Sequence, residues 1–562
     1  MEITPRSDEN KTLTFDVRVN FLCEQIPEPL SIIFKQQTGF SYSVWAPNMG
    51  FDRHIGPNWG KRRVYSRLAS WMPVYSVLKG SGKNALTVAL SDAKTPLSIG
   101  CGYCEEDGCI DHEITLFTSI IAPVKEYSAV IRLDYRDIPF SDSVYDVTEW
   151  WETECGYKPA CVPDTAKMPM DSLWYSYHQE IDVEETVKEC KIAKSLGMET
   201  VIVDDGWQTD DNNRGYKYCG DWEVTPNKIP DMKDFVRRVH DTGMKIMLWY
   251  SVPFMGLGSK NYERFKDMLL YKTGNDRDHW SLDPRYKEVR DFLIGNYVRA
   301  VKEWGFDGLK LDFIDAFELK GESLKPDDRR DIYSLEDAVD RLMKEVLTAL
   351  KEVNPDVMIE FRQSYVGPAI RQYGNILRVG DCPGDALSNR KGSVDLRLTS
   401  GKTAVHSDMM IWDESAPPEA AATQLIGSLY AVPQISVKLA YLPESHVKTI
   451  RAFLSFWLKY REVILGGRLK VTTPEAFYGS VTAEKEGVAV ITAYSDRIID
   501  LSGYREAAIV NGSSANELVI KNANGKSYEV VNCLGEKVNS GTVDGDCALV
   551  SVPITGIVYI KG

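Results

Sequence analysis

The chain has 562 residues, of which 43% are hydrophobic and 26% are charged, as in ordinary globular proteins. This length exceeds what one hydrophobic core normally serves, so we expect two or three domains. The 81 acidic residues outnumber the 66 basic ones, and the formal net charge of −15 disfavours nucleic acid and anionic membranes as partners. The sequence contains no apolar run near the roughly 18 residues that a membrane-spanning helix needs.

Residues 1–10 are polar and lack the apolar core of a signal peptide. They indicate a cytoplasmic protein, and a processed secreted or periplasmic form is the alternative. The 11 cysteines are spread along the chain, which is not the pattern of a disulfide framework.

Residues 10–145 consist of short runs in which apolar and polar residues alternate, separated by Gly, Pro and Asn. Examples are Leu13–Val19, Val74–Leu78 and Ala129–Leu133. Alternation with a period of two is typical of strands with one buried face, so it predicts an antiparallel β-sandwich domain over residues 1–150. Residues 151–171 contain Cys, Gly and several Pro, and we interpret them as a linker.

One group in this region has a spacing that could bind zinc, formed by Cys101, Cys104, Cys109 and His112. The residues on both sides of Glu105–Gly108 alternate between apolar and polar, however, which is the pattern of a β-hairpin. We favour the hairpin, with the thiols as fillers, over the zinc site.

In residues 172–464, segments typical of buried strands alternate with amphipathic helices. The expected strands are Trp174–His178, Thr200–Asp204, Lys245–Ser251, Gly308–Phe313, Val357–Phe361, Asn375–Asp381, Thr403–His406 and Gln434–Val437. The expected helices include Val183–Leu196, Met232–Thr242, Tyr286–Trp304, Leu335–Val353, Pro418–Tyr430 and His446–Tyr460. This order predicts a (β/α)8 TIM barrel of the α/β class.

The helical period disappears again in residues 465–562. Runs such as Val488–Thr492 and Ala548–Val552 predict a small C-terminal all-β sandwich domain. The expected architecture is therefore a TIM barrel between two β-domains.

Polar residues gather where five of the eight expected barrel strands end. These ends are Val203–Trp207, Leu309–Phe313, Glu360–Gln363, Arg378–Asp381 and His406–Asp408. Functional groups of TIM barrels project from the carboxyl ends of the strands. Burying a carboxylate costs free energy. A ligand-facing cavity therefore explains the acidic residues at these strand ends better than core packing does. Internal salt bridges with Lys310, Arg362 and Arg378 are the alternative.

Opposed carboxylates together with many aromatic residues favour sugar chemistry. Glycosidic cleavage uses one carboxylate that attacks or stabilises the anomeric centre and a second carboxyl group that donates a proton to the leaving oxygen. A metal or nucleotide cofactor has little support, because the chain has seven His, no His-Glu-x-x-His motif and no Walker A run. We therefore expect a reaction without metal or cofactor.

Several motifs in the barrel region occur in a recognisable order. They are Asp204–Trp207, Gly220–Pro226, Gly243–Trp249, Leu282–Arg285, Glu288–Arg290 and Trp304–Asp312. In residues 172–440 the chain resembles glycoside hydrolase family 36, which groups with family 27 in the α-galactosidase clan. The flanking β-domains agree with the layout of that family.

The resemblance implies roles for the strand-two and strand-four residues. Asp312 matches the family's nucleophile, and Lys310, on the same face of its strand, would bind sugar hydroxyls and keep Asp312 ionised. Asp204 and Asp205 match the pair that binds hydroxyls of the non-reducing sugar. Capping of a helix N-terminus is the structural alternative for this pair.

The clan's acid/base aspartate follows an arginine at the end of strand six. Here Asp381 and Arg378 match them, with two residues between them where the clan usually has three. Asp385 is therefore the reserve candidate for the acid/base.

The remaining candidates depart from the family pattern or have less support from it. Arg362 and Gln363 stand at strand five, where the family commonly has a Cys and a Gly-rich run, and they could donate to sugar hydroxyls. Trp249 could form a wall for a sugar face, or simply pack in the barrel.

His406 and Asp408 are candidates by position. Trp59, from the N-terminal domain, could close the pocket, although a surface aromatic is the more common case. Because strand five departs from the family pattern, the sequence does not determine which sugar is bound.

The resemblance implies a retaining exo-acting α-glycosidase, most simply an α-galactosidase, that acts on an oligosaccharide or glycoside. The alternatives are an α-N-acetylgalactosaminidase or β-L-arabinopyranosidase of the same clan, a transglycosidase like the raffinose synthases, and a non-catalytic carbohydrate-binding protein. Members of family 36 often form dimers or tetramers, so the resemblance is compatible with a homo-oligomer.

Overall fold

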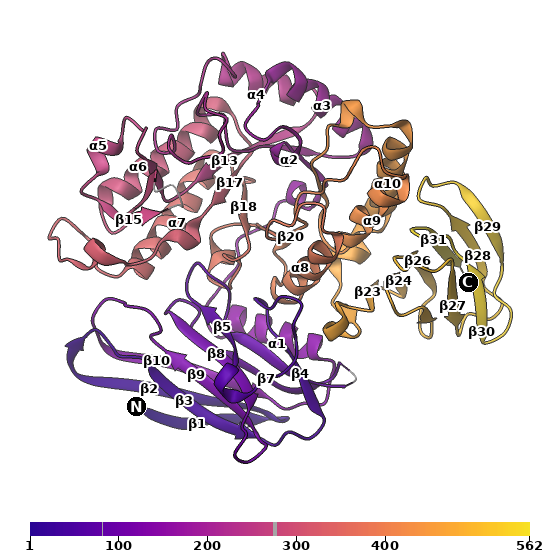
Figure 1. The fold of residues 1–562 in the computed structure, drawn as a ribbon, viewed down its shortest axis with the longest axis horizontal. Coiled ribbons are helices and arrows are strands. Elements are labelled where there is room, and N and C mark those ends of the chain that lie inside the picture. The colour runs from indigo at the N-terminus through magenta and orange to yellow at the C-terminus, as the bar shows by residue number, and fades with distance from the viewer. Residues whose placement is uncertain (81, 274–277, 562) are drawn as a thin grey trace.

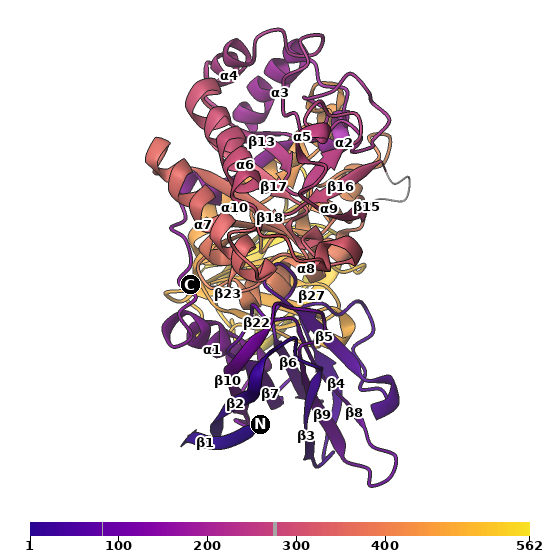
Figure 2. The ribbon, with the colours of Figure 1, turned by 90° about the vertical axis from the view of Figure 1, so that its left-hand side faces the viewer.

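The computed structural model describes residues 1–80, 82–273 and 278–561 (Figure 1). It confirms the expected fold class: a (β/α)8 barrel with an N-terminal β-sandwich on one side and a small C-terminal all-β unit on another. In Figure 1 the sandwich lies below the barrel, and the C-terminal strands lie beside helices α9 and α10. Figure 2, turned by 90°, again places the sandwich below the barrel.

The N-terminal sandwich consists of two sheets in the described part of the chain, one of six strands and one of four. The larger sheet, in spatial order, is β1 (Glu2–Glu9), β2 (Thr12–Gln25), β10 (Val124–Asp134), β7 (Asn84–Leu90), β6 (Val74–Lys79) and β4 (Ser41–Trp45). The smaller one is β3 (Leu30–Gln36), β9 (Ile110–Leu116), β8 (Leu97–Tyr103) and β5 (Arg62–Ser66). Neighbouring strands in the described part of both sheets pair antiparallel, and alternating side chains such as Val17, Val88, Ile99 and Ile114 fill the core between the sheets.

The cysteine-rich segment forms the predicted hairpin. Strands β8 and β9 pair antiparallel, with Cys101 opposite His112. His112 is buried, its Nδ1 lies 2.6 Å from the Tyr75 hydroxyl and its Nε2 lies 3.0 Å from Gln36 Oε1. Burial lowers the pKa of His112 to about 3. Both ring nitrogens therefore have partners within the sandwich.

Helix α1 (Phe140–Thr153) lies across the boundary that the sequence predicts at residue 150. It buries Val144, Val147 and Trp151, and the Trp151 indole N–H donates to the Leu90 carbonyl at 2.9 Å. The next residues run through a short 3-10 turn (Asp164–Lys167) to the first barrel strand. The division of the chain into domains at these positions stays a prediction.

The barrel sheet has eight strands within the described residues, and all its strand pairs are parallel. In chain order the strands are β11 (Met170–Ser172), β12 (Thr200–Val203), β13 (Lys245–Ser251), β17 (Gly308–Asp312), β18 (Met358–Arg362), β19 (Ile376–Arg378), β20 (Ala404–His406) and β21 (Gln434–Ile435). Parallel bridges from His406 to Val432 and from Met410 to Ile435 bring the two edges together.

The first barrel strand differs from the sequence prediction. The aromatic run Trp174–His178 resembles a strand, but Trp174–Tyr177 forms helix α2. The strand is Met170–Ser172, whose Met170 pairs with Thr200 on one side and with Gln434 on the other. The aromatic run therefore begins after the strand has already reached the carboxyl end of the barrel.

The helices that alternate with the strands cover the outside of the barrel. They are α3 (Val183–Leu196), α4 (Met232–His240), α6 (Lys287–Arg299), α7 (Leu335–Val353), α8 (Ala386–Thr399), α9 (Pro418–Gly427) and α10 (Glu444–Gly466). Helices α3 and α7 have the predicted bounds. Each begins after a residue whose side chain caps its first turn. Asp182 accepts from the Glu185 N–H, and Ser334 accepts from the Asp337 N–H.

A small sheet and a short helix, α5 (Tyr262–Phe265), follow β13. The sheet is formed by β14 (Phe254–Gly256), β16 (His279–Leu282) and β15 (Leu269–Thr273).

The C-terminal unit has a seven-stranded and a three-stranded sheet in the described part of the chain. The first, in spatial order, is β22 (Leu469–Val471), β23 (Ser480–Lys485), β24 (Val488–Ala493), β26 (Glu506–Asn511), β31 (Ile557–Lys561), β28 (Ser527–Val531) and β29 (Lys537–Thr542). The second is β25 (Ile498–Asp500), β27 (Glu517–Lys521) and β30 (Cys547–Ser551). Among the residues described, no helix combines the length and apolar character needed to cross a bilayer.

Candidate active site

The inside of the barrel changes from apolar to polar along the strands. At the amino end, an apolar cluster includes Met170, Ile202, Met247, Met358, Ile376 and Ala404. Side chains on a strand point inward at every second position. Two residues further along their strands, the inward-facing residues are Asp204, Trp249, Glu360, Arg378 and His406. Strands β17 and β18 extend this layer with Asp312 and Arg362. The predicted functional residues thus gather at the carboxyl end of the barrel.

Asp312, the predicted nucleophile, is 6% exposed and is held through both carboxylate oxygens. Its Oδ1 accepts from Arg362 Nε at 2.8 Å, from its neighbour's backbone N–H at 2.9 Å and from the Tyr365 hydroxyl. Its Oδ2 accepts from the Trp249 indole N–H at 3.0 Å. Burial acts to raise the pKa of Asp312, but the positive charges of Arg362 and Lys310 outweigh it and lower the pKa below its usual value. The carboxylate is therefore ionised and fixed in orientation.

The strand-two aspartates lie beside this carboxylate. Lys310 Nζ donates to Asp204 Oδ2 at 2.6 Å, and both side chains are buried. Asp205 accepts from the side-chain amides of Gln179 and Gln208, each at 2.7 Å. Burial raises the pKa of Asp205 to about 6. The pair faces side-chain donors, so helix capping does not account for it.

Arg378 joins the acidic residues of strands five, six and seven. Its guanidinium is 1% exposed, donates to Asp381 at 2.8 Å and to Asp408, and lies 3.5 Å from Glu360. Asp408 also accepts from the Cys382 N–H at 2.6 Å and from the Tyr175 hydroxyl at 3.2 Å. The structure thus brings Arg378, Asp381 and Asp408 into one network.

Asp381, the predicted acid/base, is the open member of this network, because 53% of its side chain is exposed. Burial of the carboxyl group acts to raise its pKa, but Arg378, then Arg362 and Lys310, lower it well below its usual range. Arg362 therefore acts electrostatically on both Asp381 and Asp312.

Asp385, the reserve acid/base candidate, caps the N-terminus of helix α8. It accepts from the backbone N–H groups of Leu387 and Ser388, each at 3.0 Å, and from the Ser388 hydroxyl at 2.6 Å. These bonds satisfy donors that the first helical turn leaves free. This local role favours Asp381 over Asp385 as the acid/base.

Comparisons with known proteins show what the chain is similar to. The melibiase family model matches residues 171–364. The α-galactosidase Mel36A of Lactobacillus acidophilus is 33% identical over 129 residues, which cover 22% of this chain and 16% of that protein. The chain resembles the α-galactosidases of glycoside hydrolase family 36. The match covers less than a fifth of the length of Mel36A and of α-galactosidase 1 from Pediococcus pentosaceus.

Solved family 36 structures extend the likeness of fold to the flanking domains. The galactosidase domain of the α-galactosidase-sucrose kinase AgaSK superposes with a TM-score of 0.67 at 15% identity, over 99% of this chain and 79% of that one. AgaA from Geobacillus stearothermophilus, solved in complex with raffinose, gives 0.66 at 14% identity, over 98% and 79%. The melibiase match includes Asp204, Asp205, Lys310 and Asp312 but ends before Arg378.

Two other predicted residues have roles that the fold itself explains. His406 is fully buried, its Nε2 lies 2.8 Å from the Ala166 carbonyl and its Nδ1 lies 3.0 Å from Gln434 Nε2. Burial lowers the pKa of His406 to about 4, so the neutral ring supports the barrel. Gln363 accepts from the Gly380 N–H at 2.9 Å and ties strand five to strand six.

Trp59 is 77% exposed on the surface of the sandwich. A different N-terminal segment contacts the carboxyl end of the barrel. The Trp71 N–H donates to the Ser364 carbonyl at 2.7 Å, and Arg67 donates to the Asp315 carbonyl at 2.6 Å. The sandwich therefore supports the loops that follow β17 and β18.

Sequence reasoning missed Tyr365, Tyr216 and Tyr175. Tyr216 stacks against Trp249 with ring centroids 6.4 Å apart and meets the edge of Phe313 at 5.2 Å. All three tyrosines come from loops or from the misassigned aromatic run, where no strand period reveals which way a side chain points. The position of Tyr365, three residues after Arg362, was the one available signal.

Proposed function

We propose that this protein is a retaining exo-acting α-glycosidase that hydrolyses terminal α-linked galactose from oligosaccharides. The observation that carries the proposal is the environment of Asp312. A buried carboxylate with a lowered pKa, held through both oxygens at the carboxyl end of a TIM barrel, suits a nucleophile that must attack in one direction. The choice of galactose as the sugar comes from the names of the similar proteins.

In the first step, Asp312 attacks the anomeric carbon while Asp381 protonates the leaving oxygen. In the second step, Asp381 takes a proton from water, which attacks the glycosyl-enzyme and releases the sugar. The ionised state of Asp381 in the free protein suits this second step. For the first step its pKa must rise, and a bound substrate that covers the 53% exposed side chain supplies the desolvation.

The sugar hydroxyls are assigned to the buried polar group beside Asp312. Asp204 and Asp205 offer carboxylate oxygens and Lys310 offers an ammonium, and the stacked rings of Trp249 and Tyr216 form an aromatic wall. Such a set of acceptors, donors and aromatic faces fits one sugar ring at the end of a chain, which is what exo action requires.

The proposal makes a geometric demand on the complex with substrate. The carboxyl groups of Asp312 and Asp381 should lie roughly 5 to 6 Å apart for retention, and a separation near 9 Å would argue for inversion.

One observation favours a second candidate of the same clan with another sugar. Arg362 at strand five donates to Asp312 and stands where family 36 commonly has a Cys and a Gly-rich run that contacts the sugar, so a different group faces the sugar near the nucleophile. An N-acetylgalactosaminide or a β-L-arabinopyranoside is then the alternative substrate.

A panel of nitrophenyl glycosides tests both candidates. We expect the highest kcat/KM on the α-galactoside, and proton NMR of the first product should show the α-anomer. A higher kcat/KM on the N-acetylgalactosaminide or the arabinopyranoside would select the alternative. Added acceptor sugars separate hydrolysis from transglycosylation, and sugar binding with no turnover of any glycoside would reject an enzyme altogether.

A further inference from the structure

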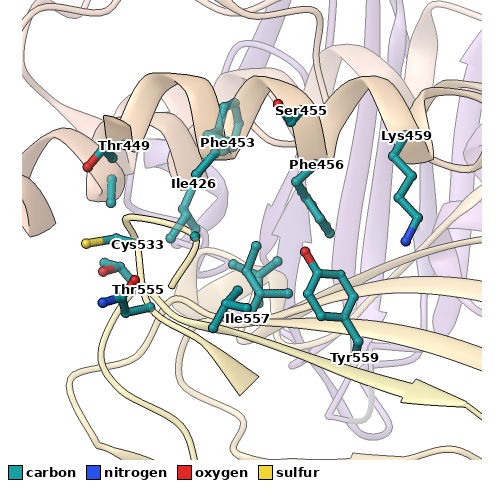
Figure 3. A pocket seen from close by; sticks show the side chains of 16 residues that line it. Ile426, Thr449, Phe453, Ser455, Phe456, Lys459, Cys533, Thr555, Ile557 and Tyr559 are labelled. Carbon is teal, nitrogen blue, oxygen red and sulfur yellow. The ribbon is translucent and has the colours of Figure 1, made fainter. Parts of the chain in front are cut away.

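A cavity that no barrel strand lines lies between helix α10 and the C-terminal sheet (Figure 3). Its volume is about 290 Å³. Helices α9 and α10 form one wall and the chain around β28 and β31 forms the other. None of the residues assigned to sugar chemistry lines this cavity, so it is separate from the candidate active site.

The middle of the cavity is apolar. Phe456 on α10 points toward Ile557 and Tyr559 on β31, and Phe453 of α10 and Ile426 of α9 also line the space (Figure 3). The Phe456 and Tyr559 rings are 6.2 Å apart and tilted by 55°. Phe453 and Phe456 are almost fully buried, although they border a space that no described side chain fills.

One end of the cavity carries a positive charge. The Lys459 ammonium lies over the rings of Tyr559, at 5.3 Å, and Tyr460, at 4.8 Å. Among the described residues, no carboxylate lies within ion-pairing distance of it, and the Glu529 carboxylate on the neighbouring strand pairs with Lys537 at 3.0 Å. In Figure 3 the Tyr559 hydroxyl points into the cavity toward Phe456, and the Lys459 ammonium lies on the other side of the Tyr559 ring.

The other end offers no charge. Cys533, Thr449 and Thr555 line it, and the two threonine hydroxyls donate to the carbonyls of Ser445 and Ile554. Most of the wall between the two ends is apolar, which suits an apolar body better than a sugar ring. An apolar body with one anionic group matches the cavity from end to end.

We propose that this cavity binds a small carboxylate with an apolar body, such as a medium-chain fatty acid. The apolar chain packs between Phe453, Phe456 and Ile557, and the carboxylate pairs with Lys459 and accepts from the Tyr559 hydroxyl. Cation–π contacts keep the ammonium at the cavity mouth before the ligand arrives.

Calorimetric titration with octanoate tests the proposal, with octanamide as the neutral analogue of the same shape, both below the concentration at which octanoate forms micelles. We expect saturable one-to-one binding of octanoate with Kd below about 1 mM, and binding of octanamide about tenfold weaker, a difference of about 1.4 kcal/mol. Absent binding, or equal binding of the two, would overturn the proposal.

Two variants and a matched control locate the site. Lys459→Met should weaken octanoate about tenfold and leave octanamide unchanged, because the methylene stem stays. Ala452→Phe, which fills the cavity, should abolish binding of both, with circular dichroism to confirm folding. Lys448→Met removes a lysine of the same helix that pairs with Glu444 outside the cavity and should change nothing. Equal effects of Lys459→Met and Lys448→Met would contradict the assignment, as would unchanged binding by folded Ala452→Phe.

Discussion

The two ends of the barrel interior are built from the same strands and differ in chemistry. On β13 the inward residues are Met247 and then Trp249, and on β18 they are Met358, Glu360 and Arg362. One step of two residues along a strand thus passes from an apolar cluster to a network of charges. The apolar end gains free energy from burial, about 1.5–3 kcal/mol for a large side chain. The polar end buries charges at a cost that ion pairs only partly offset.

Under the proposed function, the polar end serves chemistry and the apolar end serves stability. Arg378 shows the cost most directly, because it is 1% exposed and needs Asp381, Asp408 and Glu360 around it. Well-packed apolar residues could fill the same volume with equal or greater stability. Substitutions at the two ends should therefore separate activity from stability.

The largest effect is expected at Asp312. Asp312→Ala should lower kcat by about 10⁴-fold or more, because no other ionised carboxylate holds this position. Azide or formate should partly restore turnover by taking the place of the carboxylate. The measurement is kcat on a nitrophenyl α-galactoside with and without azide.

Asp385→Ala is the matched control for that variant. It removes a helix cap worth about 1 kcal/mol and should leave kcat within a few-fold of the native value. A deep loss of activity in folded Asp385→Ala, with Asp381→Asn active, would transfer the acid/base role to Asp385.

Asp381 should show an effect that depends on the leaving group. Asp381→Asn should lower kcat/KM by about 10²- to 10⁴-fold on substrates with a sugar leaving group, which need a proton. The loss should be much smaller on an aryl glycoside with an acidic phenol, because that phenolate leaves unaided. Equal losses on raffinose and on dinitrophenyl galactoside would argue against an acid role.

At the amino end, the expected effect is on stability. Met247 is fully buried, and Met247→Ala should lower the free energy of unfolding by about 2–5 kcal/mol. Below the unfolding transition, kcat should stay within a few-fold of native. Thermal unfolding and kcat at low temperature measure the two sides. A variant of native stability with lost activity would contradict the division of the barrel.

The smallest effect is a shift of the pH profile. Arg362 lowers the pKa of both Asp312 and Asp381, so Arg362→Met should raise both. In the pH profile of kcat, the acid limb, which requires ionised Asp312, and the alkaline limb, which requires protonated Asp381 in the substrate complex, should both move to higher pH. Arg362→Lys keeps the charge and should keep the limbs near their native positions. A shift of one limb alone, or in the opposite direction, would show that Arg362 does not link the two carboxyl groups.

The sequence was sufficient for the fold class and for most of the polar end, because period-two strands determine which side chains point inward. It placed Arg378 beside Asp381, and the bounds predicted for α3 and α7 from their amphipathic pattern match the structure. The strand-one assignment failed because aromatic residues favour strands wherever they occur, and here they form helix α2. The contact between Tyr365 and Asp312 depends on the path of a loop, which no periodic pattern encodes. The cap at Asp385 could have been recognised from the Asp-Ala-Leu-Ser pattern before α8.

The central claim is that Asp312 forms the covalent bond to the sugar, and trapping tests it most directly. The protein is incubated with a 2-deoxy-2-fluoro-galactosyl fluoride, which slows release of the intermediate, and is then digested and analysed by mass spectrometry. The account predicts one added fluorosugar per chain, on the peptide that contains Asp312. A label on another carboxylate, or inverted product from the parent α-galactoside with no label at all, would contradict it.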